Sequence, residues 1–155
     1  NVAYRTHYED LDIPLIMSNI SSKPKKGIMC DSMDITATFV SALGITPSSF
    51  YKGENIFLSN KNFVVSESCG SGNADIKRKD VYFTVSTKKF KMMATLSDQG
   101  LKIRKLFNKE NDPYELTDIS QKKGYKRDAT NLVKILYQKR NEIFKIKGIK
   151  KTPFA

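Results

Sequence analysis

The sequence predicts a protein of the α/β class with an α+β C-terminal subdomain. We expect a four-stranded antiparallel sheet packed on a long C-terminal helix, preceded by a strand–helix remnant of a larger, mostly parallel sheet. Four short runs rich in β-branched and aromatic residues follow residue 62, with brief links between them. A long segment with helical periodicity comes after the last of these runs. Near the N-terminus, the uninterrupted apolar run Ile13–Met17 is typical of a strand buried on both faces of a parallel sheet.

The segment before residue 63 is predicted to contain one strand and one helix. The strand is the run Ile13–Met17, and the helix extends from about Asp34 to Leu43. The apolar positions of the helix recur every four residues, at Ile35, Phe39 and Leu43. Ser32 or Asp34 can cap the start of this helix, and Gly44 can adopt the left-handed conformation that ends it.

The segment 63–155 is predicted to form the antiparallel sheet and its covering helix. The strands are expected at Phe63–Glu67, Val81–Ser86, Phe90–Thr95 and Leu101–Phe107, with a hairpin turn over residues 87–89. The helix is expected from Asp128 to about Ile146, and its apolar face is Ala129, Leu132, Val133, Leu136, Ile143 and Phe144. This face should pack across the sheet, because a one-sided sheet must cover its apolar face. We therefore predict two domains, 1–62 and 63–155.

The composition is that of a globular protein with a strongly basic surface. Among the 155 residues, 39% are hydrophobic and 28% charged, and the net charge is +11. No apolar run approaches the ~20 residues that a membrane helix needs. The lysines occur in short scattered clusters, such as Lys77–Lys79 and Lys88–Lys91, and no nucleic-acid-binding motif accompanies them. We predict a solvated, lysine-rich surface and neither a membrane nor a nucleic acid as partner.

The two cysteines, Cys30 and Cys69, do not make a disulfide framework. They can pair with each other in an oxidising compartment or stay as thiols in a reducing one. Neither has the CxxC spacing of a zinc site, and we predict no metal site in this chain.

The most distinctive run of the chain is Leu106–Ile119, with Asn111, Asp112 and Pro113 at its centre. Asn and Asp side chains bond their own backbone, and proline fixes φ for a turn. The run therefore predicts a strand that leads into a structural turn.

This run closely resembles the "LYDLENDPGETTNLA" segment near the C-terminal end of sulfatases. Other motifs resemble sulfatase motifs in the same order. Tyr8–Met17 is similar to "YE…VPLII", and Asp34–Ile45 is similar to the "D-hydrophobic-x-P-T-L-L…L-A-G-I" helix, with Ala37 in place of the family's proline. Gly53–Leu58 resembles "GxSLLP", and Phe90–Met93 resembles the "YKLI" strand. The resemblance covers about residues 4 to 120.

The resemblance implies that the parent protein hydrolyses sulfate esters of a sulfated small molecule or glycan. Sulfatases use a formylglycine, made from a C/S-x-P-x-R motif, and a calcium ion held by Asp and Asn residues. Neither Cys30 nor Cys69 lies in such a motif. In the family, the nucleophile and metal ligands precede the segment that corresponds to Asn1. We therefore predict that this chain is the C-terminal part of a sulfatase, with no catalytic residue of its own.

One substrate-binding position could lie in this chain. Many sulfatases place a sulfate-contacting lysine five residues before the Glu of "YE", and this position is Tyr4 here. Arg5 or His7 could replace that cation, and both could equally be exposed surface residues. Thr38 matches the threonine of the family's helix and is predicted to be a packing or capping residue. We assign no role to Glu67.

Two other functions stay open at this stage. The parent could be a related phosphodiesterase or phosphotransferase of the alkaline-phosphatase superfamily, because this segment does not determine the nucleophile. The chain could also be a basic binding module, whose affinity for polyanions would fall steeply with salt. If it is a truncated sulfatase, the apolar residues of the segment 13–43 should be exposed and the chain should self-associate through residues 1–60.

Overall fold

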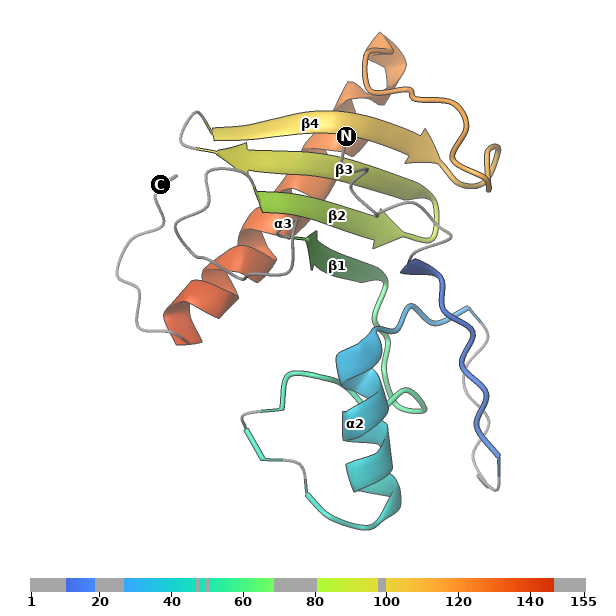
Figure 1. Ribbon diagram of the computed structural model, residues 1–155, viewed down its shortest axis with the longest axis vertical. Coiled ribbons are helices and arrows are strands. Elements are labelled where there is room, and N and C mark those ends of the chain that lie inside the picture. The colour runs from blue at the N-terminus through green and yellow to red at the C-terminus, as the bar shows by residue number, and fades with distance from the viewer. Residues whose placement is uncertain are drawn as a thin grey trace. The chain divides into compact units, whose positions relative to one another are not determined.

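The computed structural model describes residues 11–18, 27–46, 48–49, 51–68, 81–97 and 100–146. The chain divides into two compact units, one comprising Pro14–Val64 and the other Val65–Ala155 together with Asn1–Ile13. The elements are α2 (Ser32–Ala42), β1 (Phe63–Ser68), β2 (Val81–Thr87), β3 (Phe90–Ser97), β4 (Gly100–Asn108), η1 (Lys123–Tyr125) and α3 (Lys126–Ile146) (Figure 1). The predicted antiparallel sheet with its C-terminal helix is confirmed, with element ends shifted by one or two residues.

The four strands follow one another in the sheet in chain order, β1-β2-β3-β4 (Figure 1). The β2–β3 hairpin turns at Lys88 and Lys89, as the sequence predicts. Thr87 closes it, because its hydroxyl accepts a hydrogen bond from the Phe90 N–H at 2.9 Å and donates one to the Phe90 carbonyl at 3.0 Å. Between β3 and β4 the register shifts next to Met93, so that Arg104 is the extra residue of a β-bulge.

Helix α3 covers one face of the sheet (Figure 1). The buried core between them consists of Phe83, Val85, Phe90, Met92, Ala94, Leu106, Ile119, Ala129, Leu132 and Leu136. The predicted burial of Ala129, Leu132 and Leu136 is confirmed, and Val133 packs at the edge of this core. The side chains of the predicted Ile143 and Phe144 lie outside the described residues.

Leu136→Ala tests the docking of α3. The Leu136 side chain is only 3% exposed, so the substitution removes buried apolar surface and leaves a cavity. We expect a loss of about 2–5 kcal/mol in the free energy of unfolding, measured by urea denaturation. Lys134→Ala is the control, because Lys134 is exposed on the same helix. Equal stabilities for the two variants would contradict the packing described here.

The opposite face of the sheet is buried as well, contrary to the prediction of a one-sided sheet. Its buried side chains are Thr84, Lys91, Met93, Thr95 and Phe107. Burial of both faces also corrects the prediction that Lys91 belongs to a solvated lysine cluster. An alternating strand can bury a polar side chain where that side chain has a partner, and Lys91 has one, described below.

The outer edge of β4 is closed by the loop that follows it. The Asp118 carboxylate accepts a hydrogen bond from the Leu106 N–H at 3.0 Å, and the Ile119 N–H donates to the Leu106 carbonyl at 2.8 Å. Two backbone groups that would otherwise face solvent are thereby paired, and this part of the edge is protected from pairing with another chain. Partial burial would raise the pKa of Asp118, but the hydrogen bonds from the Leu106 N–H and from Ser120 lower it on balance.

In the Pro14–Val64 unit, helix α2 begins two residues earlier than predicted, at Ser32 instead of Asp34. Asp31 is the N-cap rather than Ser32 or Asp34, and it forms a capping box with Asp34. The helix ends as predicted, with Gly44 at φ +73°, a conformation that costs other residues energy. The predicted strand Ile13–Met17 makes no sheet ladder among the described residues. A strand exists only beside a hydrogen-bonded neighbour, and the prediction placed its neighbours outside this chain.

Candidate functional site

The residues proposed to bind substrate, Arg5 and His7, lie outside the described residues, as does Cys69. Cys30 is a free, exposed thiol next to the start of α2. Partial burial and the carboxylates of Asp34 and Asp31 raise the pKa of Cys30, with Lys61 opposing them. The thiolate is therefore disfavoured, so that Cys30 is a poor nucleophile.

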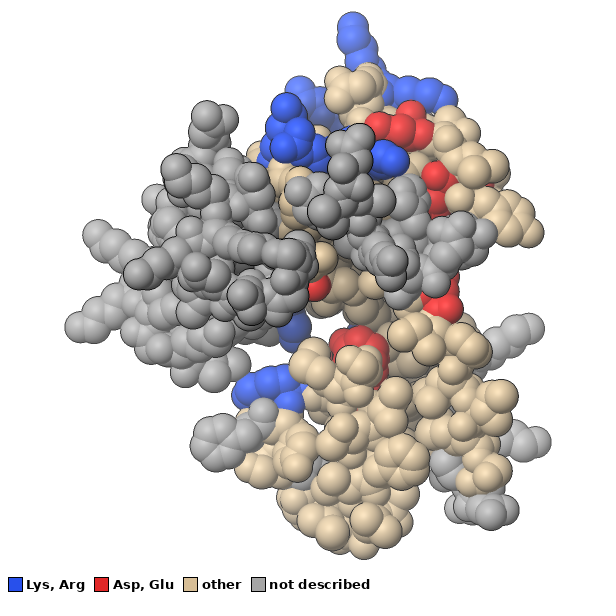
Figure 2. All heavy atoms as spheres, viewed as in Figure 1, with Lys and Arg blue, Asp and Glu red and all other residues tan. Residues whose placement is uncertain are grey.

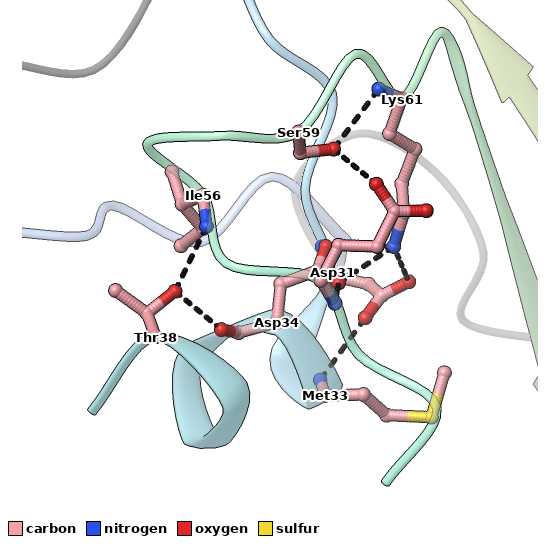
Figure 3. Close-up of polar contacts among 8 residues, drawn as sticks. Asp31, Met33, Asp34, Thr38, Ile56, Ser59 and Lys61 are labelled. Atoms are coloured by element: carbon pink, nitrogen blue, oxygen red, sulfur yellow. Dashed lines mark hydrogen bonds and ion pairs between the residues drawn. The ribbon is translucent and has the colours of Figure 1, made fainter. Parts of the chain in front are cut away.

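In the described part of the Pro14–Val64 unit, the buried side chain of Asp34 is the centre of a polar cluster (Figure 3). It lies in the first turn of α2 and is only 1% exposed. Its carboxylate accepts hydrogen bonds from the backbone N–H of Asp31 and of Glu54, each at 2.8 Å. The N-terminal end of the helix also favours a negative charge at this position. Asp34 therefore joins the start of α2 to a segment twenty residues further along the chain.

Lys61 supplies the counter-charge of this cluster (Figure 3). Its ammonium group lies 2.7 Å from the Asp34 carboxylate and 3.0 Å from that of Asp31. Burial alone would lower the pKa of Lys61, but the hydrogen bonds to Asp34 and Asp31 outweigh burial and raise it. The ammonium group therefore occupies the place between the two carboxylates that a bound cation would need.

The segment 53–61 packs on the polar face of α2 through backbone groups. Thr38 is buried, and its hydroxyl donates to the Asp34 carbonyl at 2.6 Å and accepts from the Ile56 N–H at 2.9 Å (Figure 3). Of the two predicted roles, packing or capping, these bonds and the burial of the side chain favour packing, because Thr38 lies inside α2. The backbone at Gly53 lies so close to the backbone of α2 that a Cβ atom on Gly53 would overlap the carbonyl group of Met33. The close contact with Met33 therefore requires glycine at position 53, where the sequence resembles the "GxSLLP" motif.

Gly53→Ala is expected to destabilise the Pro14–Val64 unit by at least 2 kcal/mol, roughly the cost of overpacking a rigid contact. The added methyl group meets backbone atoms of Met33 and Asp34, which cannot move without breaking the capping box. Circular dichroism during thermal unfolding measures the loss. Gly124→Ala is the matched control, because nothing lies within 4 Å of a Cβ atom there. A melting temperature equal to that of Gly124→Ala would contradict the close approach.

A second ion pair lies in the unit that contains the sheet. The Lys91 ammonium on β3 contacts both carboxylate oxygens of Glu115, at 2.6 and 2.9 Å. The two side chains are 3% and 1% exposed. Glu115 has φ +55°, which is uncommon for a residue other than glycine and shows that the loop is held in place. The pair joins the segment similar to "YKLI" to the distinctive run Leu106–Ile119.

Lys109 lies close to this pair and donates a hydrogen bond to the Ser86 hydroxyl at 2.9 Å. Burial, with a contribution from the charge of Lys91, lowers the pKa of Lys109, while Asp12 and Glu115 oppose the change. The side chains of Lys91, Glu115 and Lys109 therefore lie close together on the side of the sheet opposite α3.

The turn within Leu106–Ile119 is held by two side chains. The Asp112 carboxylate accepts from the N–H groups of Leu116 at 3.0 Å and Thr117 at 2.7 Å. The side-chain oxygen of Asn108 accepts a hydrogen bond from the Glu110 N–H, and the backbone carbonyl of Asn108 accepts one from the Asp112 N–H at 2.9 Å. The predicted structural turn is confirmed, and Asp112 orients the backbone that carries Glu115.

The carboxylates of Asp31, Asp34, Glu115 and Asp112 already have partners, which are lysine ammonium groups or backbone N–H groups. In the part of the chain that the structure describes, no group of three or more His, Cys, Asp and Glu residues could hold a metal ion, and no helix is long and apolar enough to cross a membrane. In each cluster, bonds join segments at least 20 residues apart in the sequence, so both clusters anchor the fold. Sequence analysis missed Asp31 and Lys61. The spacing of Asp31 and Asp34 fits a capping box, but nothing local marks Lys61.

No family model and no curated protein matches this chain, but solved structures do. BT4656, determined in complex with its substrate D-glucosamine-2-N,6-O-disulfate, is 16% identical with a TM-score of 0.56, and the match covers 77% of this chain and 25% of BT4656. BT1596, a 2-O GAG sulfatase, is 17% identical with a TM-score of 0.57, covering 74% of this chain and 26% of BT1596. A candidate sulfatase from Bacteroides thetaiotaomicron VPI-5482 is similar to the same degree, with 17% identity and a TM-score of 0.57 over 74% of this chain and 25% of that one.

The chain thus spans about a quarter of the length of the solved structures that it matches. BT1596 is a sulfatase, the family whose motifs the sequence resembles. The protein described here has the fold of one part of a sulfatase.

Proposed function

We propose that this chain is the C-terminal part of a sulfatase whose nucleophile and metal ligands lie in the preceding part of the polypeptide. In this proposal residues 1–62 belong to the core domain and residues 63–155 form the C-terminal subdomain. The observation that carries the proposal is the similarity of fold to BT4656 and BT1596. The order of the motifs along the chain, from Tyr8 to Ile119, agrees with it.

The substrate class follows from the same neighbours. BT4656 binds a disulfated glucosamine and BT1596 is a 2-O GAG sulfatase, so we propose a sulfated glycan as substrate of the parent protein. Cleaving a sulfate ester needs an activated oxygen nucleophile and positive charge opposite the developing negative charge. In the parent, a formylglycine and a calcium ion would supply these groups. Arg5 or His7 would add a cation at the sulfate.

Among the described residues, the carboxylates of Asp31, Asp34 and Glu115 do not fit a calcium ion. Asp31 and Asp34 already share the Lys61 ammonium group, and Glu115 is paired with Lys91. A calcium ion needs six to eight oxygen ligands, and a lysine between two carboxylates excludes it. This pairing supports the proposal that the metal ligands of the parent lie in the preceding part of the polypeptide.

The proposal predicts that this chain alone hydrolyses no sulfate or phosphate ester above background, whereas its parent hydrolyses sulfate esters. The measurement is the turnover of methylumbelliferyl sulfate by both proteins, with methylumbelliferyl phosphate in parallel. Turnover by the pure chain that scales with its concentration would show that the chain holds its own nucleophile. A parent that cleaves only the phosphate ester would show the phosphotransfer function instead.

A further inference from the structure

Helix α2 has its polar side buried and its apolar side exposed. Asp34, Ala37 and Thr38 are buried, and the side chains of Asp34 and Thr38 accept hydrogen bonds from the N–H groups of Glu54 and Ile56. At 100° per residue, these three positions lie on one side of the helix, and Thr36, Phe39 and Leu43 lie on the other. Phe39 is 54% exposed and Leu43 is 74% exposed. A helix at the surface of a complete domain normally buries its apolar side and exposes its polar side, so this arrangement is reversed.

The exposed side of α2 carries no charge. Asp34 is the only ionisable residue of the helix, and it is buried. On the face of the molecule shown in Figure 2, the surface over α2 is almost entirely uncharged. Helix α3 of the same chain differs, because it buries Leu132 and Leu136 and exposes Lys126, Arg127 and Lys134. An uncharged apolar helix face is therefore a property of α2 and not of the whole protein.

Further exposed apolar side chains belong to the same compact unit, namely Leu15, Ile16, Ile45 and Leu58. The exposure of Ile13, Leu15, Ile16, Phe39 and Leu43 agrees with the expectation that the segment 13–43 leaves apolar surface open, whereas Met17 and Ile35 are half-buried. Permanent interfaces have apolar, charge-depleted centres, whereas the surfaces of monomers rarely expose large apolar patches.

We propose that the outward face of α2, formed by Thr36, Phe39 and Leu43, is the docking surface for the preceding part of the same parent polypeptide. This inference rests on the proposed function and adds the partner of this surface. The fold match leaves about three quarters of each neighbour's length without a counterpart in this chain, since it covers 25% of BT4656 and 26% of BT1596. The section of the partner that contacts α2 should itself be apolar and uncharged, because α2 offers no charge with which to pair.

The test compares the chemical accessibility of α2 in this chain and in the full-length parent. Leu43→Cys and, separately, Phe39→Cys are made in a Cys30→Ser/Cys69→Ser background and labelled with a maleimide. We expect rapid labelling in this chain and labelling slower by about 100-fold in the parent, where it requires local opening. Leu116→Cys is the control, because Leu116 is exposed in the other unit and should be labelled equally fast in both proteins.

Equal labelling of Leu43→Cys and Phe39→Cys in both proteins would overturn the proposal. Protection that appears in this chain only as its concentration rises, with no protection in the parent, would identify a second copy as the occupant and also overturn it. The proposed function has a separate readout. A parent that lacks C/S-x-P-x-R and cleaves no sulfate ester, yet protects both cysteines, would refute the sulfatase assignment and leave the docking surface in place.

Discussion

Replacing Asp34 by alanine is expected to cost the Pro14–Val64 unit about 3–5 kcal/mol of its free energy of unfolding. The substitution leaves the ammonium group of Lys61, which is 13% exposed, with only the more exposed carboxylate of Asp31. It also removes the acceptor for two backbone N–H groups, those of Asp31 and Glu54. Urea unfolding followed by circular dichroism measures the loss.

The control for this variant is Asp31→Ala. Asp31 is the N-cap and makes the longer contact with Lys61, at 3.0 Å. Its removal should cost about 1 kcal/mol, as is usual for an N-cap. If Asp34→Ala is no less stable than Asp31→Ala, Asp34 does not anchor the cluster.

The pH dependence of stability gives a second test of the same cluster. The folded pKa of Lys61 is raised above its unfolded value, because its bonds to Asp34 and Asp31 outweigh the opposing effect of burial. The stability that this group contributes is therefore complete below the unfolded pKa of about 10.4, and it is lost as the pH rises through the folded value. Asp34→Ala should flatten this alkaline loss.

The second large effect is expected for Glu115→Ala. This substitution leaves the Lys91 ammonium group buried without its carboxylate, and removing one member of a buried pair typically costs 3–5 kcal/mol, so we expect a loss of about that size. The loop from Asp112 to Asp118 should loosen as well, because Glu115 ties it to β3. Urea unfolding monitors the stability, and hydrogen exchange of the Leu106 and Ile119 amides monitors the loop.

The matched control is Glu110→Ala, which breaks the exposed pair of Lys89 and Glu110 at 3.3 Å. Exposed pairs contribute about 0–1 kcal/mol, because water and salt screen them. Lys91→Met combined with Glu115→Ala should recover part of the stability, because no unpaired charge remains. A loss for Glu115→Ala as small as that for Glu110→Ala would mean that the pair is not buried in solution.

The sequence by itself determined the four strands and the helix of the segment 63–155 and their order, whereas the strand predicted at Ile13–Met17 is not formed among the described residues. Alternation of apolar and polar residues marks β4, and the spacing of Ala129, Leu132 and Leu136 marks the buried face of α3. The turn at Asp112 and Pro113 and the left-handed Gly44 were also predictable, since such features depend on residues within a few positions of one another. The capping box of Asp31 and Asp34 was encoded in the same local way, although it was not recognised.

Only the tertiary structure decided which side of α2 and which lysines are buried. The contact between Lys61 and Asp34 spans 27 residues and that between Lys91 and Glu115 spans 24, so no local pattern marks either pair. A lysine is usually exposed, and it is buried only where the fold brings a carboxylate to it. The stripe of Ile35, Phe39 and Leu43 identified the helix correctly, but helical periodicity does not specify a partner. The segment 53–61 packs on the opposite, polar side through backbone hydrogen bonds, which depend on chain geometry and not on hydrophobicity.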